Sequence, residues 1–100
     1  MQIAEKREPD TWTLYLSGEL DLTGGPELAA YTEGKLSDVE TLILDMTDVR
    51  YMSSAGIRAV LNVKRALGRN TLRITGCNAM VYEVFELTGL DSVFEVEKAE

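Results

Sequence analysis

Residues 45–57, with the sequence DMTDVRYMSSAGI, join two strongly patterned segments of the chain. Residues 41–44 before them, TLIL, form a continuous apolar run, which is typical of a strand buried on both faces. Residues 55–67 after them repeat apolar side chains at helical spacing. The stretch therefore predicts a strand-to-helix connection with Ser53 or Ser54 as the helix N-cap, whose hydroxyl accepts a hydrogen bond from a free backbone N–H of the first turn.

The segments on either side predict the element order β-β-α-β-α-β-α-β. Residues 1–7 and 11–17 are expected to form a hairpin around a turn at 8–10, with Trp12, Leu14 and Leu16 on one face. The following helix is expected to begin near residue 23, capped by Thr23 or Gly25, and to end between residues 31 and 36. A starting hairpin followed by β-α units predicts an α/β domain with a mixed sheet of about five strands and helices packed on it.

The second half of the chain continues this pattern. Glycines end both later helices, at Gly68 and Gly89, and Asn78 is the expected N-cap of the third helix. Strands are predicted over residues 71–75 and 93–96. The apolar positions of the third helix are supplied by Met80, Val81, Val84, Phe85 and Leu87.

The composition limits the classes of function. The chain has a formal net charge of −7, whereas binding to nucleic acid needs a basic surface. It contains no histidine, which removes the commonest general base, the commonest metal ligand and any Ser-His-Asp or Cys-His nucleophile system. We therefore expect a non-enzymatic protein without a metal or another cofactor.

The length of 100 residues predicts a single domain over residues 1–100. No apolar run is long enough for insertion into a membrane, and residues 1–7 lack the apolar core of a signal peptide. The single cysteine, Cys77, cannot form an internal disulfide and is expected to be a small core residue. These features favour a cytoplasmic location.

The serine stretch is more specific than a helix cap requires. Two large apolar residues, Tyr51 and Met52, precede the hydroxyls, and the small residues Ala55 and Gly56 follow them. This arrangement resembles the motif of the STAS domain family, which includes bacterial anti-sigma factor antagonists and the cytoplasmic ends of sulphate transporters. In the antagonists, the motif is an aromatic residue, Met or Ile, Asp, Ser, Ser or Thr, Gly, Leu.

Carried over residue by residue, the resemblance makes Ser54 the phosphoacceptor, Gly56 the motif glycine and Ile57 the motif leucine. The chain departs from the motif at Ser53, where the family usually has Asp, and at Ala55, where it often has Ser or Thr. Ser53 is therefore a rival acceptor.

Two flanking segments also resemble the family, so the resemblance spans nearly the whole chain. Residues 18–21, GELD, match a segment that ends the second strand of the family's sheet, and residues 88–94 match its closing segment. In the family, the Asp of the first segment lies near the phosphoserine loop. For Asp21, contact with a partner and a role as a turn or capping carboxylate are both open.

The resemblance implies an anti-sigma factor antagonist. Its unphosphorylated form would bind an anti-sigma factor with serine kinase activity and so release the sigma factor. Phosphorylation would end binding, because a phosphate adds about −1.5 to −2 charges to the interface, and a serine phosphatase would restore it. The partner-binding surface predicted around Ser54 consists of Asp21, Thr23, Ser53, Ala55, Gly56, Ile57 and Arg58.

Two other classes of function remain open. An unphosphorylated STAS subunit that scaffolds a transporter or a sensory assembly would have the same fold. A receiver-like protein would be phosphorylated on Asp45, at the end of the buried strand, with Asp21 and Asp48 as possible metal partners. The starting hairpin opposes the receiver hypothesis, because receivers resemble a strict β-α alternation.

Overall fold

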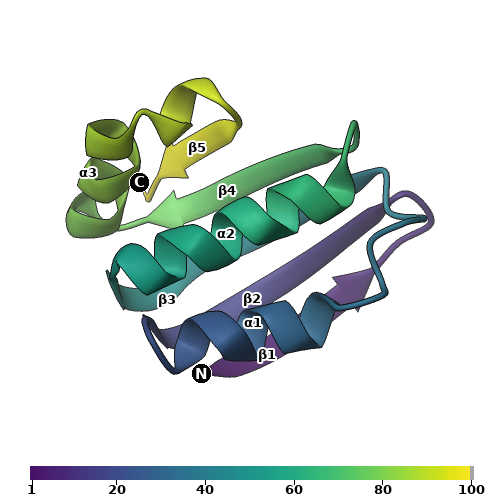
Figure 1. The fold of residues 1–100 in the computed structure, drawn as a ribbon, viewed down its shortest axis with the longest axis horizontal. Helices are drawn as coiled ribbons and strands as arrows, with labels where there is room; N and C mark the ends of the chain where they lie inside the picture. Colours follow the sequence, from purple (N-terminus) through teal and green to yellow (C-terminus); the bar gives the residue numbers. More distant parts are fainter. Residues whose placement is uncertain (100) are drawn as a thin grey trace.

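The computed structural model describes residues 1–99, which form a five-stranded mixed sheet in the order β1-β2-β3-β4-β5 (Figure 1). The strands are β1 (Gln2–Arg7), β2 (Thr11–Leu20), β3 (Thr41–Met52), β4 (Thr71–Cys77) and β5 (Glu95–Lys98). Only β1 is antiparallel to its neighbour. The helices are α1 (Gly24–Thr32), α2 (Ser54–Leu67) and α3 (Ala79–Thr88), followed by the 3-10 turn η1 (Leu90–Ser92). The predicted fold class and element order are confirmed.

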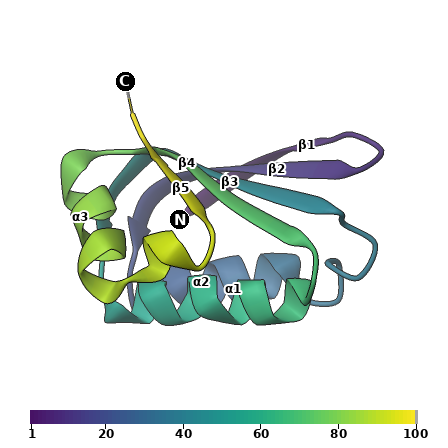
Figure 2. The same cartoon turned by 90° about the horizontal axis from the view of Figure 1, so that it is seen from above.

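The helices cover one face of the sheet, and the core lies between the two layers (Figure 2). In β3, Leu42 and Leu44 are fully buried, whereas Ile43 between them is only half-buried. The prediction that residues 41–44 are buried on both faces was therefore wrong. The face without helices instead carries polar side chains beside Ile43, among them Thr13 and Arg73.

Strand β3 is much longer than the apolar run that predicted it, since it continues to Met52. Residues 45–52 are therefore strand, and Ser53 is the only residue between β3 and α2. The pairing with β2 shifts register twice: Tyr15 pairs with Asp45 but Ser17 pairs with Asp48, and a second shift follows Gly18. Each shift adds a residue to β3, as in a β-bulge, which breaks the period-two alternation of side chains.

The third helix buries only some of its apolar positions. Asn78 caps it as expected, because its side chain accepts a hydrogen bond from the Val81 N–H at 2.8 Å. Gly89 ends it with a φ of 76°, in the left-handed region that a C-terminal glycine adopts readily. Of its apolar positions, Val81 and Phe85 are buried in the core, whereas Met80 and Leu87 are 51% and 78% exposed.

The remaining corrections concern the ends of elements. The last strand begins at Glu95 instead of at residue 93, because the chain first forms the turn η1. Gly68 ends α2 as expected and has a positive φ of 60°, but its ψ of −116° lies outside the left-handed helical region in which a C-terminal glycine is usually found. Cys77 is buried as predicted, and burial raises the pKa of its thiol to about 12.

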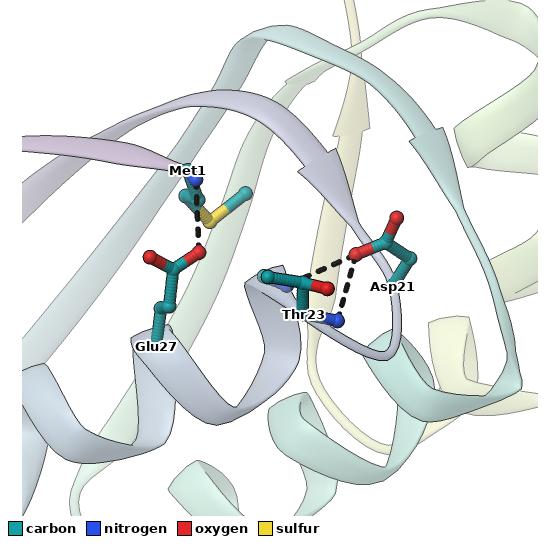
Figure 3. A network of polar contacts seen from close by, with 5 residues as sticks. Met1, Asp21, Thr23 and Glu27 are labelled. Atoms are coloured by element: carbon teal, nitrogen blue, oxygen red, sulfur yellow. Dashed lines mark hydrogen bonds and ion pairs between the residues drawn. The ribbon is translucent and has the colours of Figure 1, made fainter.

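Helix α1 is capped by a residue that precedes its N-cap. Thr23 occupies the N-cap position but makes no side-chain hydrogen bond, and Gly25 lies within the helix. Instead, the Asp21 carboxylate accepts hydrogen bonds from the backbone N–H groups of Gly24 and Thr23, both at 3.0 Å (Figure 3). The expected cap at Thr23 or Gly25 is thus replaced by Asp21, whose side chain satisfies N–H groups that the first helical turn leaves free.

These two hydrogen bonds stabilise the charged form of Asp21, so they lower the pKa of its carboxyl below the usual 3.8. A pKa that is lower in the folded state contributes stability above the unfolded pKa, and that stability is lost as the pH falls through the folded pKa. Asp21→Ala should therefore lower the free energy of unfolding at neutral pH, and its deficit should shrink at about pH 2. Urea unfolding at both pH values measures the difference.

The matched variant Asp21→Asn retains an oxygen that accepts both hydrogen bonds but removes the charge, so its stability should lie between the other two. A deficit for Asp21→Ala that is equal at both pH values would contradict a cap that depends on the charge.

Candidate functional site

The two serines lie at the junction of β3 and α2, on the edge of the sheet where the parallel strands β2 and β3 both end. Ser53 is the N-cap of α2, with an extended backbone, and Ser54 is the first helical residue. The Ser53 N–H donates to the Leu20 carbonyl at 3.1 Å, and the Ser53 carbonyl accepts the Ile57 N–H at 3.0 Å. The serine loop, residues 53–58, is thereby tied both to the end of β2 and to its own helix.

The two hydroxyls differ in their access to solvent. The Ser53 Oγ is buried and has no hydrogen-bond partner within residues 1–99, so the expected capping bond to the first turn is not made. Ser54, by contrast, is an exposed residue. A reagent or partner that approaches this edge of the sheet therefore meets the Ser54 side chain.

Gly56 is buried where the first turn of α2 crosses the end of β2. A Cβ atom at this position would collide with the Leu20 carbonyl oxygen and would lie 2.8 Å from the Met52 Cγ. Only a residue without a side chain permits this approach. Gly56 therefore positions the serine loop, and the residue itself is buried in the free chain.

The other predicted site residues divide into exposed and packed ones. Arg58 and Thr23 are exposed, and Arg58 has no ion pair within residues 1–99. Ala55 and Ile57 are half-buried, and Ile57 packs against the core. Asp21 is half-buried and its carboxylate already accepts the two capping hydrogen bonds.

The register of the sheet brings the two predicted halves of the surface together. Leu20 pairs with Met52, so the loop after β2 lies beside the serine loop. Between them is a hollow of about 320 Å³, whose lining includes Ala55, Arg58 and Leu22. Leu22 was not predicted as a site residue, although its side chain is 77% exposed. The only sequence signal is an isolated apolar residue in a polar loop, which is common on protein surfaces.

The geometry opposes the receiver hypothesis. Asp45 lies in the middle of β3, away from the edge where the strand ends, and its carboxylate accepts the Thr47 N–H at 2.9 Å. The prediction that Asp45 ends the buried strand was wrong, because β3 continues to Met52. Among residues 1–99, no group of three or more His, Cys, Asp or Glu side chains is placed to hold a metal ion. Within the same range, no helix has the length and apolar character that a membrane span needs.

The model of the STAS domain family matches residues 2–100. An anti-sigma-B factor antagonist of Listeria monocytogenes is 25% identical over 99 residues, which cover 96% of this chain and 87% of that protein. Among solved structures, an anti-sigma factor antagonist from Mycobacterium paratuberculosis has a TM-score of 0.85 at 21% identity, covering 96% of this chain and 84% of that one. The Bacillus protein SpoIIAA in its unphosphorylated form has a TM-score of 0.82 at 22% identity, covering 95% and 87%. The chain therefore belongs to the STAS domain family.

Proposed function

We propose that residues 1–100 act as a single STAS domain in the bacterial cytoplasm, as an anti-sigma factor antagonist switched by phosphorylation of Ser54. The observation that carries this proposal is the exposed Ser54 hydroxyl at the first residue of α2, beside a Ser53 hydroxyl that is buried. Ser54 also occupies the acceptor position of the family's motif, and the Listeria relative is named an antagonist.

The partner is an anti-sigma factor with serine kinase activity, and the surface that binds it surrounds Ser54. Ala55, Arg58 and Thr23 contribute exposed or half-exposed groups, and Asp21 holds the neighbouring loop. Because the chain contains no histidine, the kinase supplies the base that accepts the Ser54 hydroxyl proton. A serine phosphatase reverses the modification.

Phosphorylation has little effect on the stability of the domain itself. The phosphate lies at the N-terminus of α2, where free N–H groups and the helix dipole favour an anion by about 0.3–1 kcal/mol. The exposed Arg58 adds a solvent-screened attraction of at most about 1 kcal/mol. Repulsion from the Asp21 carboxylate opposes both, so we expect a net change within about ±1 kcal/mol.

The same phosphate has a large effect on binding. A partner that closes over Ser54 must remove water from a group with nearly two negative charges, and a buried charge without a partner costs several kcal/mol. The unphosphorylated hydroxyl carries no such penalty. The switch therefore acts on the interface and leaves the fold in place.

Ser54 is the residue that we expect the kinase to modify. Incubation with the cognate anti-sigma factor kinase and ATP should place a phosphate on Ser54, and Ser54→Ala should abolish it. Ser53→Ala is the matched control: it should remain a substrate and should fold normally, because the hydroxyl it removes has no hydrogen-bond partner within residues 1–99. Mass spectrometry locates the phosphate. Phosphate on Ser53 alone would sink the assignment.

A further prediction separates binding from folding. Phosphorylated protein should bind the anti-sigma factor at least about a hundredfold more weakly than the unmodified protein. This ratio corresponds to a loss of roughly 2.7 kcal/mol in binding free energy. Calorimetric titration measures the affinities, and urea unfolding of both forms should give free energies within about 1 kcal/mol of each other. Equal affinities would favour a scaffolding STAS subunit, and an unfolded phosphorylated domain would contradict the switch mechanism.

A further inference from the structure

A groove runs along the outer side of α1 and α2, which lie side by side in Figure 1. Its first part is the 320 Å³ hollow beside the serine loop. A second hollow of about 560 Å³ continues it toward the far ends of both helices. Three residues line both hollows and make them one groove, namely Pro26, Ala29 and Asn62.

The groove exists because small side chains line the contact between the helices. At Gly25, a Cβ would lie only 3.0 Å from the Ala55 carbonyl oxygen, so the helices approach closely there. Beyond this contact, the lining includes alanines from both helices, such as Ala29 and Ala66. The surface between the helices is therefore hollow and largely apolar, whereas larger side chains at these positions would fill the space.

The two ends of the groove differ in the side chains that line them. Leu22 lines the end beside the serine loop and is 77% exposed, although burying a leucine side chain is worth about 1.5–3 kcal/mol. Among residues 1–99, the hollow at this end has one charged lining residue, Arg58, and the hollow at the other end has one, Glu33. The exposed Leu22 thus lies beside Ala55 and Arg58, two of the residues proposed to bind the partner, and Arg58 has no ion pair within residues 1–99.

We propose that this groove receives an amphipathic helix of the anti-sigma factor. The inference depends on the proposed function and specifies how the partner docks. The distance from Arg58 to Ala66 along α2 is about 12 Å at 1.5 Å per residue, which matches roughly two turns of a bound helix. The apolar row of that helix packs on Leu22 and the groove. An acidic residue at one end meets Arg58, and a basic residue at the other meets Glu33.

Two features favour this occupant over a second copy of the chain, namely the position of the groove and its small size. The groove is continuous with the proposed binding surface at Ala55 and Arg58, so one partner covers both. The opposite charges at its two ends would pair equally well with a second copy turned end to end, so they do not decide between the two occupants. A short groove supplies a few apolar anchor contacts at the edge of a larger interface, as is usual for binding hot spots.

The test uses the anti-sigma factor that co-purifies with the wild-type chain, then produced pure and titrated against variants. Leu22→Asp should weaken binding at least about thirtyfold, because it places a charge at an apolar contact. Leu87→Asp is the matched control, because Leu87 is 78% exposed but lies on α3, outside the groove. The affinity of this variant for the anti-sigma factor should remain within about twofold of wild type. Both variants should keep the urea midpoint of the wild type.

A second variant tests the far hollow without changing charge. Ala66→Trp fills the groove from an exposed helical position and should weaken binding about tenfold. If Leu22→Asp and Ala66→Trp both bind like wild type while Ser54→Asp does not, the groove is overturned and the proposed function stands. A wild-type chain that binds no anti-sigma factor overturns both. Sedimentation tests the remaining occupant. If the wild-type chain forms a dimer that Leu22→Asp dissociates, the groove binds a second copy and the proposal is overturned.

Discussion

The structure around the candidate site depends on the close approach of α2 to the end of β2. Gly56 lies against the Leu20 carbonyl, and the same carbonyl accepts the Ser53 N–H at 3.1 Å. The first turn of the helix can reach that hydrogen bond only because position 56 has no Cβ. This contact turns the Ser53 hydroxyl inward, leaves Ser54 at the surface, and sets the loop after β2 beside both.

A switch of this kind needs a rigid frame and an exposed acceptor, and the two come from different parts of the sequence. The frame is the sheet together with the buried Gly56. Under the proposed function the acceptor is the exposed Ser54, so a phosphate added there would be hydrated in the free domain and would become costly only when a partner displaces that water. The Asp21 cap serves the frame as well, because it holds the start of α1, where Gly25 lies close to the Ala55 carbonyl.

The fold class, the element order and the serine junction could be predicted because the apolar periods in the sequence are clear there. The length of β3 could not, because its two register shifts break the alternation after Met46 and hide the strand among polar residues. The exposure of Met80 and Leu87 depends on where α3 lies over the sheet, which helical spacing does not encode. The difference in access between Ser53 and Ser54 depends on the position of Leu20, a contact distant in sequence. The α1–α2 groove likewise arises only when the two helices are packed together.

The most direct test of this account is the free energy of unfolding of Gly56→Ala, measured in urea. Helix propensity alone predicts that alanine stabilises this position by roughly 0.5–1 kcal/mol. The crowding against Leu20 and Met52 predicts the opposite sign, a loss of about 1–3 kcal/mol. Ala66→Ser, at an exposed position of the same helix, should change stability by no more than about 0.5 kcal/mol. A Gly56→Ala protein as stable as the wild type, or more stable, would contradict the claim that this close contact positions the serine loop.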